Sequence, residues 1–232
     1  MPTYYRKNGK TAQYLEVSIG SIIDQGYKNW KLIVIGDKYE PKEELDKIIE
    51  KFNTICDNKI IYLYNLKPER EFVLNNDINL WNCAGVNAVN MGLEWGVENN
   101  FNYFFHLDDD DKWSENHLQK HMDIYSKYKN CVFVVSKSTY PNGIFLPDGV
   151  TDQVYENNIK PTPCNMVHSS FSFRNDILNL YYPKANGPNG LPYPADALML
   201  HNIDKFLLKS NQQYSSIYIP ILTCYHDEQS FL

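Results

Sequence analysis

The stretch YFFHLDDDDKW at residues 103–113 joins a short apolar run to four consecutive aspartates. An apolar, aromatic run bounded by polar residues predicts a buried strand at 103–107. In α/β proteins, ligands commonly bind at the open ends of such strands. Neighbouring carboxylates in a partly buried site repel one another strongly. We therefore expect that a bound cation, or hydrogen-bond donors of a ligand, neutralises the charge of residues 108–111. The alternative is a solvated acidic turn that caps the next helix.

Length and composition indicate one large globular domain. Of the 232 residues, 43% are hydrophobic and 22% charged, which predicts a substantial core and little disorder. The net charge of −6 argues against nucleic acid held by general electrostatic attraction. The five cysteines are an odd number without paired spacing, and this indicates free thiols in a reducing compartment. We find no transmembrane segment or signal peptide in the sequence, so we expect a cytoplasmic protein.

Helix and strand patterns alternate along the chain. Before the acidic run, apolar spacing predicts helices over about 15–25, 41–52 and 84–95. Apolar runs predict strands at 31–35 and 60–64. This order predicts an α/β fold with a mostly parallel sheet flanked by helices. After the acidic run, the same signals predict helices at 118–125 and 196–209 and strands at 131–135, 171–173 and 217–222.

Three blocks of sequence resemble glycosyltransferase family 2. PTYYR at residues 2–6, with the strand over 32–37, is similar to the family's Pro-Thr-Tyr-Asn-Arg opening and acid-tipped second strand. AVNMG at 88–92 is similar to Ala-Arg-Asn-x-Gly. LDDDDKW at 107–113 matches Leu-Asp-x-Asp-Asp-x-Trp, the DXD motif of the family's metal site. The three blocks occur in the family's order. Together they are stronger evidence for the resemblance than any one block alone.

The resemblance implies a GT-A fold, a Rossmann-like nucleotide-binding half joined to an acceptor-side half. It implies one domain over residues 1–232, with the nucleotide-sugar-binding half at about 1–113 and the acceptor-binding half at about 114–232. The family places a full apolar strand before the Pro-Thr-Tyr block, whereas here the block begins at Pro2. We therefore expect the first core strand to be missing or truncated, which would leave unpaired backbone groups on its neighbours.

On the donor side, the resemblance implies four nucleotide-sugar-binding residues. Tyr4 is expected to pack against a uracil ring, and Asp37 to accept a hydrogen bond from the base or ribose. Asn90 and Asp108 complete the set. The alternatives are an exposed tyrosine for Tyr4 and an ordinary turn residue for Asp37.

A metal ion is expected at the acidic run. A nucleotide-sugar donor leaves as a diphosphate, and a divalent cation stabilises the charge that develops. Hard oxygen ligands suit Mn²⁺ or Mg²⁺ better than zinc. The resemblance implies Asp110 as a direct ligand, Asp108 at the ribose or a metal-bound water, and His226 as a further ligand; for His226 the alternative is a surface histidine. Asp109 is interpreted as a solvent-facing residue and Asp111 as a helix cap. The substitution Asp109→Asn is therefore expected to have little effect on metal-dependent donor binding.

Inversion at the sugar carbon needs a base that takes the proton of the incoming hydroxyl. In the family this base lies in a Glu-Asp pair that opens a late helix. The matching stretch YPADAL at 193–198 makes Asp196 the candidate base, with a helix cap as the alternative. His168 lies where the family lines the acceptor side and is either functional or structural. Three residues depart from the family pattern: Gly36, Val89 and Ala195.

The leading hypothesis is a metal-assisted, inverting glycosyltransferase of the hexosyltransferase type. It would move a sugar from a nucleotide-diphosphate donor, a UDP-sugar, to a hydroxyl of a glycan, lipid or protein. The alternative is a catalytically inactive relative that binds a nucleotide or glycan. A nucleotidyltransferase would share the layered plan, but its Gly-rich loop with a basic residue does not follow the chain start.

Overall fold

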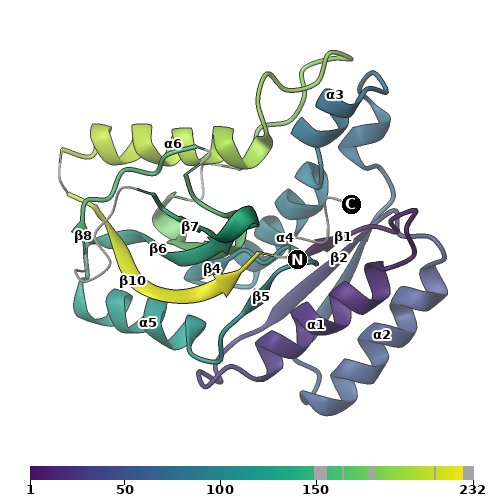
Figure 1. The fold of residues 1–232 in the computed structure, drawn as a ribbon, viewed down its shortest axis with the longest axis horizontal. Coiled ribbons are helices and arrows are strands. Elements are labelled where there is room, and N and C mark those ends of the chain that lie inside the picture. Colours follow the sequence, from purple (N-terminus) through teal and green to yellow (C-terminus); the bar gives the residue numbers. More distant parts are fainter. Residues whose placement is uncertain (149–155, 164, 178–180, 212, 227–232) are drawn as a thin grey trace.

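Two β-sheets flanked by helices make up the protein (Figure 1). The computed structural model describes residues 1–148, 156–163, 165–177, 181–211 and 213–226. The predicted α/β class is confirmed, with helices and strands alternating through the first half of the chain.

The first sheet is parallel, in the order β1-β2-β3. Its strands are Pro2–Thr3, Leu32–Asp37 and Ile60–Asn65. Three long helices, α1, α2 and α4, accompany it and span Thr11–Ile23, Lys42–Ile55 and Val86–Glu98. The inner faces of α1 and α2 pack on β2 through apolar side chains that recur at helical spacing, among them Leu15, Ile19, Leu45 and Ile48.

The second sheet is mixed and has the order β4-β9-β6-β10-β5, with β7 beside β6 and β8 beside β10. The strands β4 to β10 span, in chain order, Tyr103–Phe105, Lys112–Trp113, Cys131–Tyr140, Ile144–Leu146, Glu156–Asn157, Phe171–Arg174 and Ser215–Tyr225. Only β6 and β10 pair in parallel here. The parallel pairing that the sequence predicts is therefore found throughout the first sheet. In the second sheet, among the strands that the structure describes, it is found at one pair only.

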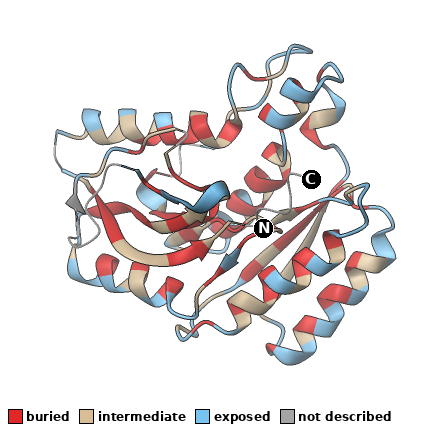
Figure 2. Ribbon diagram, viewed as in Figure 1, coloured by how far each residue is buried: buried red, intermediate tan, exposed pale blue. Residues whose placement is uncertain are grey.

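Helices α5 (His117–Lys127) and α6 (Ala195–Lys209) cover opposite faces of the second sheet. Phe133 of β6 joins the apolar cluster under α6, whereas its neighbour Val134 joins the one under α5. This alternation follows from the two-residue period of a strand, which turns successive side chains to opposite faces. Figure 2 shows the result as buried strands between helices whose outer faces are exposed.

The shorter elements lie in the connections. α3 spans Asp77–Asn82 and is capped by Asn76, whose side chain accepts a hydrogen bond from the Asn79 backbone at 2.9 Å. The four 3₁₀ turns η1 to η4 are Glu69–Glu71, Pro141–Gly143, His168–Ser170 and Asn175–Ile177. The described cysteines are buried free thiols, at 56, 83, 131 and 224; position 164 lies outside the described residues. None of the helices in the described part combines the length and hydrophobicity that a membrane span requires.

The place of the expected first strand holds only two paired residues. β1 pairs with β2 at Ile35 and Gly36, and the Met1 amino group donates to the Ile33 carbonyl at 3.0 Å. Within the described residues, β4 pairs on one edge alone, with β9. A cavity of about 370 Å³ lies between β2 and β4, far larger than the small voids usual in protein interiors. The two sheets therefore meet across this cavity instead of forming one continuous sheet.

Gly36 departs from the family pattern for a packing reason. A Cβ at this position would lie 2.8 Å from Leu45 Cδ2 and 2.9 Å from Tyr64 Cδ2. Both distances are shorter than a carbon–carbon contact allows. A larger residue at this position would therefore require the Leu45 or Tyr64 side chain to shift.

Candidate active site

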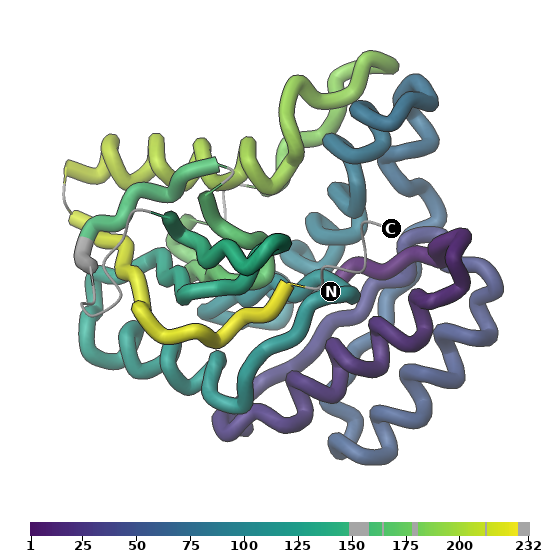
Figure 3. The backbone as a smooth tube through the Cα atoms, viewed as in Figure 1, coloured from purple at the N-terminus to yellow at the C-terminus, as the bar shows by residue number. Residues whose placement is uncertain are grey.

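The four aspartates after β4 bind three separate parts of the chain: the chain start, η3 and the residue after β10. Residues 108–111 form a turn in which the Asp111 amide donates to the Asp108 carbonyl at 3.2 Å. The chain start reaches this turn near the centre of the molecule (Figure 3). The acidic run is thus surrounded by protein groups and is not a solvated turn.

Asp109 is buried in an ion pair with Arg6. The Arg6 guanidinium donates to both carboxylate oxygens, at 3.0 and 2.6 Å, and Thr3 Oγ1 donates to Oδ2 at 2.5 Å. The interpretation of Asp109 as solvent-facing is therefore wrong, because 4% of this residue is exposed. Its donors come from the chain start, more than 100 residues away in sequence.

Asp110 shares the same guanidinium, with Arg6 Nη2 at 3.0 Å from its Oδ2. Burial and the charges of the three neighbouring aspartates raise the pKa of Asp110 to about 7, and Arg6 offsets this only in part. The acidic run therefore carries negative charge that a bound cation would neutralise. Among the residues that the structure describes, however, no three His, Cys, Asp or Glu side chains converge as a metal-binding group.

Asp111 binds His226, which β10 brings back to the acidic run. His226 Nδ1 lies 2.7 Å from Asp111 Oδ1. Burial lowers the pKa of His226, but the hydrogen bond and charge of Asp111 raise it to about 9. His226 is therefore not a surface histidine and lies beside the acids, where the metal site is predicted. Asp111 is not a helix cap, since it is buried and α5 begins after Asn116.

Asp108 has the most exposed side chain of the four, at 31%. His168 Nδ1 lies 2.9 Å from its Oδ1. Burial would raise the pKa of Asp108, but the charge and hydrogen bond of His168 outweigh burial and hold that pKa below its ordinary value. Asp108 is thus ionised and partly open to a ligand.

Tyr4 and Asp37 belong to one cluster that Arg70 of η1 joins. Arg70 binds the Asp37 carboxylate and donates to the Asp37 carbonyl at 2.6 Å. Its guanidinium lies 5.4 Å from the centre of the Tyr4 ring, and that of Arg6 lies at 4.9 Å. Arg6 therefore links this cluster to the acidic run. The sequence analysis missed Arg70, although a basic residue soon after β3 was a usable signal.

Asn90 is used for structure in this arrangement. Its Nδ2 donates to the Tyr182 carbonyl and its Oδ1 accepts from the Tyr182 amide, both at 2.9 Å. Both amide atoms thus hold the Tyr182 segment against α4.

Asp196 lies in the first turn of α6, where the cap position is Pro194 and no side chain caps the helix. The helix-cap alternative is therefore wrong. Burial lowers the pKa of His168, but Asp108 and, more weakly, Asp196 raise it above its ordinary value. The charge of Asp196 thus acts on the same histidine that binds Asp108.

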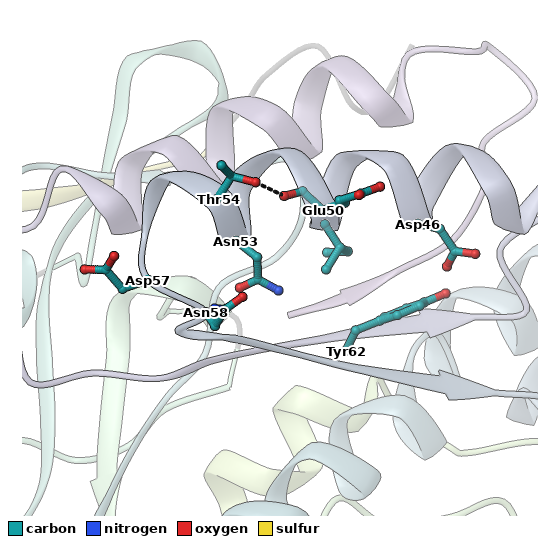
Figure 4. A pocket seen from close by; sticks show the side chains of 8 residues that line it. Asp46, Glu50, Asn53, Thr54, Asp57, Asn58 and Tyr62 are labelled. Atoms are coloured by element: carbon teal, nitrogen blue, oxygen red, sulfur yellow. Dashed lines mark hydrogen bonds between the residues drawn. The ribbon is translucent and has the colours of Figure 1, made fainter.

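A separate hollow of about 540 Å³ lies between α2 and β3 (Figure 4). Asp46, Glu50 and Asp57 contribute acidic side chains to it, and Tyr62 lies across it from α2. None of the four aspartates of the acidic run lines this hollow. It is therefore not part of the candidate active site.

Comparison with known proteins gives sequence relatives over most of the chain. Residues 1–179 match the family Glycosyl transferase family 2. The chain is 40% identical over 233 residues to a protein of Acanthamoeba polyphaga mimivirus named "Uncharacterized glycosyltransferase R139", covering 98% of this chain and 92% of the relative. It is 31% identical over 118 residues to the "Putative colanic acid biosynthesis glycosyl transferase WcaA" of Escherichia coli K12, covering 51% of this chain and 33% of that protein.

Solved structures of S. aureus TarS share the fold. TarS residues 1–349 align with a TM-score of 0.64 and 14% identity, covering 97% of this chain. The same fragment in complex with UDP-GlcNAc aligns with a TM-score of 0.63 and 14% identity, covering 98% of this chain. The chain spans 58% and 57% of those two structures.

The buried Arg6–Asp109 pair predicts an effect of Asp109→Asn on stability. Removing the charge leaves Arg6 with less compensation in a nearly closed site, so the free energy of unfolding should fall by about 3–5 kcal/mol. Urea denaturation measures this loss. The matched control is Glu16→Gln in the exposed pair with Lys51, which should cost less than about 1 kcal/mol. Equal small losses in both variants would contradict the assignment.

Proposed function

Since the chain belongs to glycosyltransferase family 2, we propose that it transfers a sugar from a UDP-sugar to an acceptor hydroxyl with inversion, assisted by Mn²⁺ or Mg²⁺. The observation that carries this proposal is the contact between two clusters. Arg6 binds Asp109 and Asp110 and also lies over Tyr4. Arg70 lies over the same ring and binds Asp37. A nucleotide-binding surface and an acidic run are thereby held side by side.

Tyr4 is the proposed stacking surface for the uracil ring. The residue is 42% exposed, so part of it is open to a ligand. Arg6 and Arg70 beside it supply positive charge, which favours a negatively charged diphosphate. The UDP and UDP-GlcNAc named for the TarS structures make a UDP-sugar the first donor class to consider.

The donor set suits a hard divalent cation. Carboxylate oxygens are the preferred ligands of Mn²⁺ and Mg²⁺, and the raised pKa of Asp110 indicates negative charge that is not compensated. Asp108, Asp110 and His226 would hold the ion. Because they do not converge as a metal-binding group in the described residues, Asp110 would exchange its contact with Arg6 for the metal and His226 would lose its proton on binding. When bound, the ion would neutralise charge on the departing diphosphate.

Asp196 is the proposed base. As the acceptor oxygen forms its bond to the anomeric carbon, the bond from that carbon to the diphosphate oxygen breaks, and UDP leaves with the electron pair. The acceptor proton passes to the Asp196 carboxylate. Attack from the face opposite the leaving group inverts the configuration. The charge of Asp196 acts on His168, which binds Asp108, and this supports Asp196 as a base near the acidic run.

Asp196→Asn should leave donor binding intact and lower the turnover number by about 10²–10⁴-fold, because the amide cannot take a proton. Turnover with saturating donor and calorimetric binding of UDP separate the two properties. Asp204→Asn is the matched control on the same helix. Asp204 contacts Lys160 at 3.7 Å, so this substitution should leave the turnover number unchanged. Unchanged turnover in Asp196→Asn would exclude it as the base.

A panel of nucleotide sugars tests the function as a whole. We expect release of nucleotide from a UDP-sugar, with Mn²⁺ or Mg²⁺ and not in chelator. Release from a donor with another base would contradict the UDP assignment. Binding of UDP without release from any donor would favour the inactive binding module.

A further inference from the structure

The η3 turn, His168–Ser170, contacts both the backbone and the side chain of Asp108, the first aspartate of the acidic run. The Asp108 amide donates to Ser169 Oγ at 2.9 Å, and His168 Nδ1 lies 2.9 Å from Asp108 Oδ1. Trp113 Nε1, five residues further along, donates to the Ser169 carbonyl at 2.7 Å. Three contacts therefore fix the two ends of the acidic run on one turn of the C-terminal half.

The ring of His168 is itself held on its other side. Its Nε2 lies 2.7 Å from the hydroxyl oxygen of Tyr182, a residue that is 3% exposed. The Tyr182 backbone is bonded in both directions to Asn90 of α4. His106 packs against the His168 ring with 4.5 Å between ring centroids. The ring has little freedom to turn.

The hydrogen bonds agree with two states of the His168 ring, and in both of them Nδ1–H donates to Asp108. In the neutral ring Nε2 accepts from the Tyr182 hydroxyl, and in the imidazolium Nε2–H donates to the Tyr182 oxygen. The side chain of His168 is 12% exposed, against 31% for Asp108. The histidine is thus mostly enclosed, and the carboxylate that it holds is the more open of the two groups.

On the basis of the proposed function, we propose that His168 is a positioning residue for the donor. It fixes the Asp108 carboxylate in the orientation that meets the nucleotide sugar, and Tyr182 and Asn90 fix His168 in turn. Removing a residue that hydrogen-bonds to a ligating side chain commonly lowers affinity or activity by about 10–100-fold. Without that residue, the ligating side chain has to be ordered when the ligand binds. This role differs from that of an acceptor-lining residue.

Two substitutions of His168 separate its two contacts. The amide nitrogen of asparagine lies near the position of Nδ1, and that of glutamine near Nε2. H168Q, which loses the contact with Asp108, should raise the donor KM by about 10–100-fold. H168N, which keeps a donor for Asp108, should raise it less, and the acceptor KM should stay unchanged in both. Exposed His201 of α6 provides the control H201Q, with no expected effect.

The outcomes distinguish this inference from the proposed function. If the wild-type protein binds no nucleotide sugar, the proposed function fails, and the donor role of His168 fails with it. If wild type binds a donor and folded H168Q binds it equally well, the inference fails alone. Equal losses in H168N and H168Q, or a change confined to the acceptor KM, would also overturn it.

A spectroscopic measurement tests the contact without activity. Ring ¹⁵N chemical shifts of His168 in the wild-type protein should show a protonated Nδ1. Asp108→Ala removes the acceptor and should shift the tautomer population, whereas H201Q should leave the His168 signals in place. A His168 ring whose shifts ignore Asp108→Ala would show that the two side chains are not coupled.

Discussion

The ion pair between Arg6 and Asp109 joins the start of the chain to the end of β4. Arg6 donates to two carboxylates in a run of four, three of which are almost enclosed. Unpaired carboxylates in such a place would be costly. The pair also sets the position of Tyr4, because the same guanidinium lies over its ring. The proposed donor surface and the acidic run are therefore held together by one side chain.

Asp108 and Asp110 differ in their pKa values because their surroundings differ. Asp108, held by His168, has a lowered pKa, whereas the pKa of Asp110 is raised to about 7. Asp110 is consequently the carboxylate that a cation would stabilise most. Asp109 and Asp111 are committed to Arg6 and His226. Identical side chains thus take different roles through their surroundings.

Local patterns in the sequence carried the prediction of β2, β3 and the long helices, because burial on one face dictates apolar spacing. They could not identify long-range partners. The contact of Asp109 with Arg6, and that of Asn90 with Tyr182, join residues about 90 to 100 positions apart. The antiparallel pairing of β4 with β9 also depends on how distant strands meet, which spacing within a strand does not encode.

A double-mutant cycle on Arg6→Met and Asp109→Asn tests most directly whether this pair supports the acidic run. The free energies of unfolding of wild type, both single variants and the double variant supply the coupling energy. If the two side chains stabilise each other as a buried pair, the double variant should lose less than the sum of the single losses, by about 1–3 kcal/mol. Losses that add to within about 0.5 kcal/mol would contradict the account.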